Sequence, residues 1–296
     1  MKILLTGKTG QVGHQLERSL QGLGCVMALD SKQMNLADLD AVRRVIRELK
    51  PDLIVNPAAY TAVDQAEKEA ELAQLVNGVA PGVMAEEARA LGAAMIHYST
   101  DYVFDGSKSG AYVETDPASP QNVYGKTKLA GEEAVAAAGI PHLILRTSWV
   151  YGLRGKNFLL TVKRLAAERD ELRIVADQIG APTWSRTIAD TTAHIVARLQ
   201  PHPVRNSAKE LARAQWEAAT GIYHLTAQGS TSWHGFTEAI VAHPSTPKKP
   251  VVKPIATEEY PLPARRPKNS VLSCAKLIGA FCDLPHWDKA LALCLD

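Results

Sequence analysis

A tyrosine and a lysine four residues apart, Tyr124 and Lys128, are the pair of side chains in this sequence with the clearest chemical use. On a helix, residues at this spacing lie one turn apart on the same face. A tyrosine hydroxyl titrates near pH ~10, but a neighbouring ammonium group stabilises the phenolate and lowers that pKa. The pair can then protonate an oxygen that gains negative charge as hydride arrives. The same spacing often arises by chance, in which case Lys128 is an exposed helix lysine.

A glycine-rich turn near the amino terminus is the second chemical feature. Gly7, Gly10 and Gly13 follow the apolar run 2–6 directly and precede a helical pattern. Glycines at this spacing let the backbone approach a pyrophosphate, and the helix that follows offers free N–H groups to the phosphates. Its position between a strand and a helix favours a dinucleotide site over a purely structural turn.

The second strand ends at an acidic residue, Asp30, where such folds bind the adenosine ribose. A carboxylate there repels a 2′-phosphate and favours NAD(H), whereas Lys32 can offset this repulsion and admit NADP(H). The cofactor preference is therefore open, and Asp30 can also be a turn residue only.

Two other strand ends carry polar or small side chains. Ser99 and Thr100 close the strand that begins at Ala94, and either hydroxyl can polarise a substrate carbonyl. The stretch 56–59 (Asn-Pro-Ala-Ala) closes another strand. Its small residues let a nicotinamide ribose pack on the backbone, or they only make room for a helix.

These residues meet if their strands are parallel, because the carboxyl ends then lie along one edge of the sheet. Residues 1–150 alternate short apolar runs with longer amphipathic ones, which predicts an α/β fold with a Rossmann-type doubly wound parallel sheet. The expected strands are 2–6, 26–29, 53–55, 94–99 and 143–147, and the expected helices are 11–23, 39–49, 66–91 with a break near Pro81, and 123–138.

The second half is less regular and predicts a smaller C-terminal α/β substrate domain. Helices are expected at 158–168 and 187–199, strands at 172–175 and 221–225, and a proline-bearing loop at 176–184. Residues 244–267 hold seven of the 17 prolines and are expected to be extended or loop-like. We therefore expect a dinucleotide-binding domain over 1–150, to which segments near 180–200 and 221–242 return, and a mainly substrate-binding domain over 151–296.

The composition narrows the partners. The formal net charge is +2, so no strong field indicates nucleic acid or a membrane, and no apolar run reaches the length of a membrane span. None of the four cysteines forms a Cys-x-x-Cys pair, so free thiols in a reducing, cytoplasmic setting are expected. The nine histidines show no metal-ligand spacing. Basic residues that cluster late can face an anionic substrate or solvent, namely Lys248, Lys249, Lys253, Arg265, Arg266 and Lys268.

Together these features resemble the extended branch of the short-chain dehydrogenase/reductase superfamily, and more closely the dTDP-4-dehydrorhamnose reductase family. The glycine and tyrosine–lysine motifs mark only the superfamily, whereas 146–151 (Arg-Thr-Ser-Trp-Val-Tyr) and 265–267 (Arg-Arg-Pro) are more specific. Similar segments extend over nearly the whole chain, at 5–13, 55–64, 99–104, 124–132, 146–151, 177–183 and 265–270.

The resemblance implies roles for individual residues. Tyr124 would be the proton donor with Lys128 as its partner, and Thr100 the polarising hydroxyl. The residues implied at the dinucleotide are Gly7, Gly10, Gln11, Val12, Gly13, Asp30, Asn35, Leu36, Ala59, Tyr60, Thr61, Tyr124 and Lys128. The residues implied at the substrate are Thr100, Asp101, Trp149, Arg265 and Arg266. The family often has an acidic residue where Asn35 stands, and Trp149 can instead be an ordinary core tryptophan.

The activity implied is reduction of the C4 keto group of dTDP-4-dehydro-β-L-rhamnose to dTDP-L-rhamnose, with NADP(H) or NAD(H). Two alternatives stay open: another extended short-chain reductase or epimerase on a different nucleotide sugar, or a non-catalytic regulatory subunit on the same fold. The resemblance also admits a homodimer and Mg²⁺, although no carboxylate cluster demands the metal. Relative to the family, the stretch 202–215 looks inserted and has no assigned role.

Overall fold

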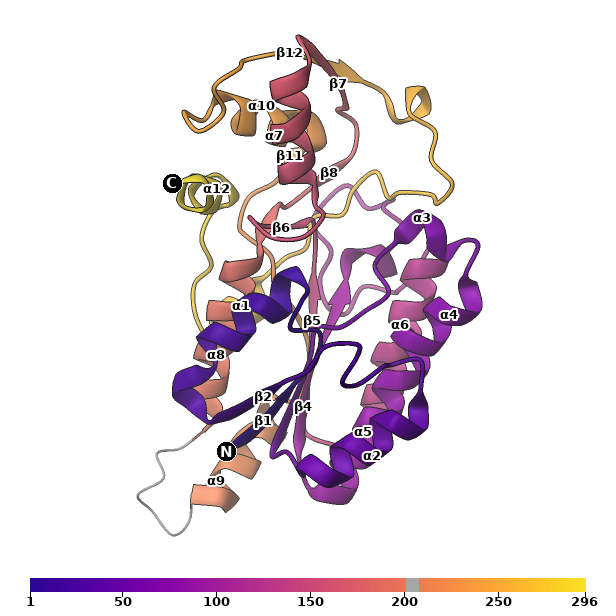
Figure 1. Cartoon of the computed structure of the whole chain (residues 1–296), viewed down its shortest axis with the longest axis vertical. Coiled ribbons are helices and arrows are strands. Elements are labelled where there is room, and N and C mark those ends of the chain that lie inside the picture. Colours follow the sequence, from indigo (N-terminus) through magenta and orange to yellow (C-terminus); the bar gives the residue numbers. More distant parts are fainter. Residues whose placement is uncertain (201–207) are drawn as a thin grey trace.

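The computed structural model describes residues 1–200 and 208–296, so the expectation for 202–207 lies outside the described residues. Within them, the larger part is a six-stranded sheet with the order β10-β5-β4-β3-β1-β2 (Figure 1). Its strands are β1 (Lys2–Leu5), β2 (Cys25–Ala28), β3 (Leu53–Asn56), β4 (Ala94–Thr100), β5 (His142–Thr147) and β10 (Gly221–His224). Every neighbouring pair is parallel, which confirms the predicted fold class.

The strand order reverses between β1 and β3, which is where sheets of this kind bind ligands. The turns that follow these two strands come very close together there. Gly7 has a φ of +60°, and a Cβ on it would lie only 3.0 Å from the Cβ of Ala58. The small residues at 57–59 therefore allow two backbone turns to meet at the mouth of the site.

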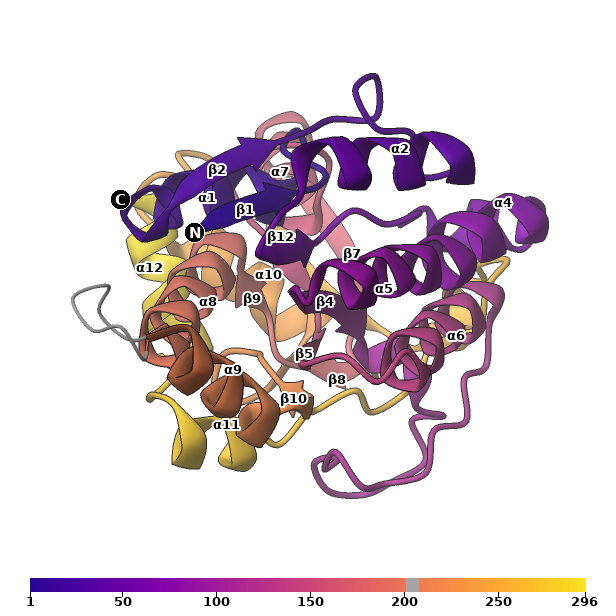
Figure 2. The ribbon, with the colours of Figure 1, turned by 90° about the horizontal axis from the view of Figure 1, so that it is seen from below.

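Helices cover both faces of the sheet (Figures 1 and 2). On one face α1 (Gln11–Ser19) packs against α8 (Ser185–Leu199), and on the other α5 (Ala80–Leu91) packs against α2 (Leu39–Leu49) and α6 (Val123–Ala137). Figure 2 shows α9 (Ala208–Ala219) and α11 (Ala275–Ala280) beside α8, near the β10 edge. The last eight residues of the stretch that looked inserted, 208–215, thus form the first part of α9.

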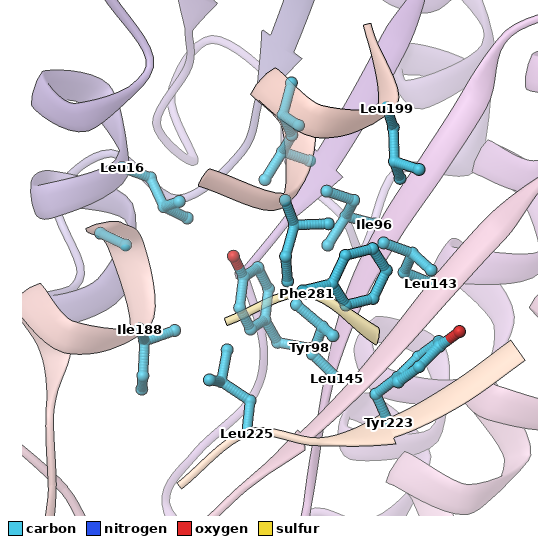
Figure 3. Close-up of a cluster of buried hydrophobic side chains, with 14 of the residues drawn as sticks. Leu16, Ile96, Tyr98, Leu143, Leu145, Ile188, Leu199, Tyr223, Leu225 and Phe281 are labelled. Carbon is cyan, nitrogen blue, oxygen red and sulfur yellow. The ribbon is translucent and has the colours of Figure 1, made fainter. Parts of the chain in front are cut away.

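Each face of the sheet has its own buried cluster, because successive strand residues point to opposite sides. Ile3 and Leu5 face the α1–α8 side, while Leu4 faces the α2–α5 side. Figure 3 shows the first cluster, in which Tyr98 of β4 lies among aliphatic side chains such as Ile188 and Leu225. This rigid layer fixes the ends of β4 and β5, where the candidate site begins.

The expected helix 66–91 is interrupted before Pro81, and the interruption is a π-helical segment. A short α3 (Val63–Ala66) is followed by α4 (Ala70–Gln74), a π-helical segment η2 (Leu75–Val79) and α5. Proline has no N–H for the ordinary helical bond, so the wider π turn comes directly before Pro81. The proline then occupies the first turn of α5, where its missing N–H costs little.

The smaller part lies above the carboxyl ends of the strands (Figure 1). Its apolar core is built from α7 (Phe158–Glu168), α10 (Trp233–Ala242) and α12 (Trp287–Leu295). Its strands pair as β6 (Val150–Tyr151) with β9 (Thr183–Trp184), β8 (Ile179–Gly180) with β11 (Thr231–Ser232), and β7 (Glu171–Val175) with β12 (Val251–Ile255). The 3₁₀ turns are η1 (Gln21–Leu23), η3 (Asp101–Val103) and η4 (Thr257–Glu259).

Two expectations for the second half were wrong, those for 176–184 and for the end of 221–242. Residues 176–184 contain β8 and β9 and are not only a loop. The proline-rich stretch 244–267 is extended in part, as expected, and it contains β12, because Pro254 sits in a strand that pairs with β7 alone and so tolerates a missing donor. Of the segment 221–242, β10 joins the large sheet, but α10 packs its apolar face against α7 in the smaller part.

No helix of residues 1–200 or 208–296 combines the length and apolar character that crossing a membrane requires.

Candidate active site

A cavity of about 670 Å³ opens at the carboxyl ends of β1, β3 and β4. All of the residues expected at a dinucleotide line it, from the glycine turn to the tyrosine–lysine pair: Gly7, Gly10, Gln11, Val12, Gly13, Asp30, Asn35, Leu36, Ala59, Tyr60, Thr61, Tyr124 and Lys128. Residues 114 positions apart in the sequence, Gly10 and Tyr124, therefore share the wall of one cavity.

The glycines at 7 and 13 determine the shape of the turn because they carry no side chain. A Cβ on Gly13 would overlap the carbonyl oxygen of Gly7, so no larger residue fits without moving the turn. The N–H of Gly10 donates to that same carbonyl at 2.9 Å, which closes the turn. Helix α1 then begins at Gln11 without any side-chain cap, which leaves its first N–H groups free for an anion.

Asp30 lines the cavity just after β2, and its carboxylate has two kinds of neighbour. Oδ1 accepts from the backbone N–H groups of Lys32 at 3.0 Å and Gln33 at 3.1 Å, so Asp30 does shape a turn. Oδ2 lies 3.9 Å from Nζ of Lys8, a cation that sequence reasoning had not placed here. Asp30 therefore shapes the turn and also places its carboxylate at the cavity wall, next to Lys8.

Tyr124 stands in the first turn of α6, close to η3. The side chain of Asn122 caps the helix by accepting from the N–H of Gly125 at 2.7 Å. A Cβ on Gly125 would overlap the carbonyl oxygen of Tyr102, so the glycine lets α6 approach η3. The Tyr124 ring meets the Tyr102 ring edge-on, with centroids 5.7 Å apart. Burial raises the pKa of Tyr124 to about 12, and the nearby Thr100 hydroxyl opposes that shift.

Lys128 follows one turn later and is 2% exposed, so the exposed-lysine alternative is wrong. Its ammonium donates to the carbonyl oxygen of Tyr98 at 2.6 Å. Burial lowers the pKa of Lys128 to about 8, and the nearby Glu132 carboxylate opposes that shift. The expected lowering of the Tyr124 pKa by this ammonium is not found here, because burial of the phenol dominates. Tyr124 is thus held protonated at neutral pH.

A buried polar chain lies behind Lys128 and was missed in the sequence. Nε2 of His97 is 3.4 Å from Nζ of Lys128, and Nδ1 of His97 is 3.1 Å from the amide nitrogen of Asn56. The hydroxyl of Thr6 donates to Oδ1 of Asn56 at 2.7 Å. Burial and the Lys128 charge hold the pKa of His97 well below its ordinary value, so the imidazole is neutral. Polar residues inside otherwise apolar strands were the available signal.

Thr100 and Asp101 are buried at the end of β4, outside the lining of the cavity. The Thr100 hydroxyl donates to Oδ1 of Asp101 at 2.9 Å and accepts from the N–H of Tyr102 at 3.2 Å. Oδ2 of Asp101 has no partner among the described residues. Burial raises the pKa of Asp101 to about 7, so near neutral pH the carboxyl group is protonated in about half of the molecules.

This shift predicts how stability depends on pH. The unfolded carboxyl loses its proton near its ordinary pKa of 3.8, earlier than the folded one, so Asp101 costs stability progressively as pH rises to about 7 and fully above it. We expect Asp101→Asn to raise the melting temperature by roughly 3 °C at pH 8 and by less at pH 5, measured by calorimetry. The control is Asp105→Asn, because hydrogen bonds lower the pKa of Asp105 and its loss should destabilise. An equal gain for Asp101→Asn at both pH values would contradict the assignment.

The remaining expected substrate residues are arranged around the smaller part. The Trp149 ring is partly exposed and stacks on Trp233 with centroids 3.5 Å apart, which occupies one of its faces. A Cβ on Gly180 would overlap this ring, so Gly180 makes room for it. Arg265 and Arg266 line a second cavity of about 540 Å³. Arg265 is exposed, whereas Arg266 is bound by Asp64.

Ser99 and Thr147 line the large cavity, and their buried hydroxyls have no partner among the described residues. Ser99 was one of the two hydroxyls considered for β4, and Thr147 was missed. Thr147 ends β5 beside Thr100, its Cα partner on β4. A buried hydroxyl without a protein partner calls for water or a ligand group.

Among the described residues, no group of three or more His, Cys, Asp or Glu side chains is placed to hold a metal ion. The expectation of Mg²⁺ rests on the resemblance alone and stays untested.

Comparisons with known proteins agree with one another along the whole chain. The family model for the RmlD substrate binding domain matches residues 1–296. A dTDP-4-dehydrorhamnose reductase of Burkholderia thailandensis is 50% identical over 100% of this chain and 98% of that protein. The Escherichia coli K12 protein of the same name is 42% identical over 97% of this chain and 94% of its own length. A crystal structure of dTDP-4-dehydrorhamnose reductase from Bacillus anthracis in complex with NADP has a TM-score of 0.87 at 34% identity, covering 99% and 98% of the two chains.

Proposed function

The chain belongs to the dTDP-4-dehydrorhamnose reductase family, and from that membership we propose that it reduces the C4 keto group of dTDP-4-dehydro-β-L-rhamnose with NAD(P)H to give dTDP-L-rhamnose. It is an oxidoreductase of the Rossmann-type, extended short-chain class. The observation that carries the proposal is the single cavity that joins the glycine turn to Tyr124 and Lys128.

The cavity fits a dinucleotide on three counts. The glycines at 7, 10 and 13 carry no side chain, so a pyrophosphate can approach the backbone of the turn. The uncapped start of α1 supplies N–H groups and a partial positive charge for the phosphates. The partnerless hydroxyls of Ser99 and Thr147 are suited to hydrogen-bond the polar end of a nicotinamide. When bound, the reduced nicotinamide would supply two electrons and one hydrogen to the C4 carbon.

Three side chains would handle the proton that the C4 oxygen needs. Tyr124 is the donor, since burial keeps it protonated at neutral pH. Lys128 stabilises the phenolate that remains, which is re-protonated from solvent after the reaction. Thr100 polarises the carbonyl, and it can turn its hydrogen toward the substrate when protonated Asp101 donates to it.

The second cavity supports binding of the nucleotide diphosphate. Arg265 and Lys268 contribute cations to its wall, and Gln178, Thr257 and Tyr260 contribute polar groups. Arginine suits a diphosphate because its planar fork binds two oxygens at once. We assign the dinucleotide to the larger part (1–150 with α8 and β10) and the sugar nucleotide mainly to the smaller part within 151–296.

The choice between NADH and NADPH is tested by Asp30→Asn. The amide oxygen still accepts from Lys32 and Gln33, so the turn is kept while the negative charge is removed. We expect the ratio of kcat/KM for NADPH over NADH to rise about tenfold, because repulsion of a 2′-phosphate disappears. Lys32→Gln should shift the ratio the opposite way. An unchanged ratio in Asp30→Asn would leave Asp30 with its turn role only.

The activity itself is tested by following NADPH and NADH absorbance with enzymatically made dTDP-4-dehydro-β-L-rhamnose. Stoichiometric oxidation with dTDP-L-rhamnose as product is the expected result. Conversion without net oxidation would indicate an epimerase, and dinucleotide binding without any turnover would indicate a regulatory subunit. We further propose that the enzyme works in the cytoplasm, which its four free cysteines support, and that it forms a homodimer.

A further inference from the structure

One segment of the chain, residues 264–270, runs from the second cavity to the start of helix α6, and we name it the arginine strap. It leaves the second cavity, where Ala264, Arg265 and Arg266 are part of the wall, and passes beside α3 toward the catalytic end (Figure 1). Pro267 lies so close to Gly106 that a Cβ on this glycine would overlap it. The strap is therefore packed against the loop that follows β4.

Asp64 of α3 holds the strap at two points. Its carboxylate binds the guanidinium of Arg266 through both oxygens, at 2.5 and 2.8 Å. Oδ1 of Asp64 also accepts from the backbone N–H of Ala264 at 3.1 Å. Paired planar contacts of this kind fix direction as well as distance. The carboxylate thus sets both the backbone and the side chain of the strap.

Asn122 fastens the strap to the catalytic helix. Its Oδ1 caps α6, and its Nδ2 donates to the carbonyl oxygen of Arg265 at 2.8 Å. Tyr124 comes two residues later. The strap is therefore tied both to the helix that carries the proposed proton donor and to α3, which follows the cavity-lining turn 57–61.

These contacts engage both terminal nitrogens of the Arg266 guanidinium. Besides Asp64, it donates to the carbonyl oxygen of Ala264 at 2.6 Å, and its side chain is 15% exposed. Arg265 differs, because it is exposed and its side chain makes one long hydrogen bond, 3.4 Å to Gln121. Two adjacent arginines of one wall therefore have different freedom to meet an anion.

We propose that Asp64 is a positioning residue that holds Arg266 as a structural anchor, so that Arg265 alone of the two arginines binds the substrate's diphosphate. This deepens the proposed function and rests on it for the identity of the diphosphate. The opposite arrangement, in which the diphosphate takes Arg266 away from Asp64, makes contrary predictions for the same variants.

The first test measures binding of thymidine 5′-diphosphate by calorimetry in the presence of NADP⁺. Asp64→Asn and Arg266→Gln should each weaken binding about tenfold and to the same extent. The double variant should bind no worse than either single one, since both changes break one anchor. Arg265→Gln should weaken binding further when added to Asp64→Asn. The control is Glu168→Gln, which breaks an exposed carboxylate–arginine pair on α7 and should bind like wild type.

The same variants distinguish the opposite arrangement. If Arg266 binds the diphosphate, Asp64→Asn frees it and binding tightens or stays unchanged, while Arg266→Gln weakens binding far more. Unchanged or tighter binding in Asp64→Asn would overturn the proposal, and so would a much larger loss in Arg266→Gln than in Asp64→Asn. In turnover assays, Asp64→Asn should raise KM for the sugar nucleotide about tenfold while kcat and KM for NADPH change less than about twofold.

A second measurement does not depend on the ligand. Amide hydrogen exchange over 264–270 should speed up in Asp64→Asn and Arg266→Gln but not in Glu168→Gln. Asn122→Ser should also speed it up while keeping the helix cap, because serine caps well but lacks the second donor. Unchanged exchange in Asp64→Asn, Arg266→Gln and Asn122→Ser would show that these contacts do not anchor the strap. Faster exchange, combined with no binding of the diphosphate to wild type, would keep the anchor and contradict the proposed substrate.

Discussion

Tyr124→Phe should lower kcat by about 10³-fold while KM for NADPH stays within about twofold. The substitution removes one oxygen and keeps the ring that packs edge-on against Tyr102. Because burial raises the pKa of this hydroxyl to about 12, it carries its proton throughout the neutral range and can give it to the developing alkoxide. Without it, water must reach a partly enclosed site. Steady-state kinetics with saturating NADPH measure the effect.

The matched control for this loss is Tyr223→Phe. The Tyr223 hydroxyl donates to the carbonyl oxygen of Ala219, and the ring belongs to the cluster of Figure 3, away from both cavities. This variant should turn over like wild type. A Tyr124→Phe enzyme that keeps more than about a tenth of the wild-type kcat would rule out Tyr124 as the proton donor.

The sequence was sufficient to predict the sheet and the glycine turn because both depend on local patterns. Buried parallel strands need continuous apolar runs, such as Ile3 to Leu5, and the turn needs glycines at fixed spacing. The predicted order of motifs then placed Gly7 and Tyr124 at the same edge. These signals act over a few residues, so they can be read without knowing any contact between distant parts.

The contacts that distinguish neighbouring residues could not be predicted in this way. Asp64 and Arg266 are 202 residues apart, and nothing in either local pattern indicates that they pair. Adjacent Arg265 and Arg266 therefore looked equivalent. Likewise, β12 was hidden among prolines, since a proline is acceptable only at an edge that the sequence does not reveal. Burial decides these cases, and burial depends on the whole fold.

The surroundings of Lys128 also could not be predicted from local sequence patterns. The four-residue spacing predicted that Lys128 and Tyr124 would share a helix face, and both line the cavity. The spacing could not predict that the ammonium is 2% exposed and bonded to the carbonyl oxygen of Tyr98, next to neutral His97. Those partners come from β4, which is 28 or more residues earlier in the chain. The charge of Lys128 is therefore costly to the fold.

This cost leads to the second large expected effect: Lys128→Met should lower kcat/KM by about 10²–10³-fold and yet raise the melting temperature at pH 7. Methionine is similar in length and apolar, so it fills the site. Burial lowers the pKa of Lys128 from 10.5 to about 8, a difference worth on the order of 3 kcal/mol. Glu132 keeps its partner Arg146, at 2.9 and 2.6 Å, so no carboxylate is left uncompensated.

The sign of the pH dependence makes this prediction specific. Below pH 8 both the folded and the unfolded chain carry the Lys128 proton, so the wild type bears the full cost of the buried charge. Between pH 8 and 10.5 the folded chain loses the proton first, and wild-type stability gains relative to the variant. His97 and Glu132 are the titratable groups near Lys128, and Tyr124 lies one helical turn away; His97 and Tyr124 stay neutral over this range. The gain in melting temperature for Lys128→Met should therefore be larger at pH 7 than at pH 10 in calorimetry.

The control is Lys126→Met. Lys126 is an exposed lysine on the same helix, so this substitution should change neither the activity nor the pH dependence of stability. A Lys128→Met protein that is markedly less stable than wild type at pH 7 would show that the ammonium supports the fold, and the trade of stability for catalysis argued here would be wrong.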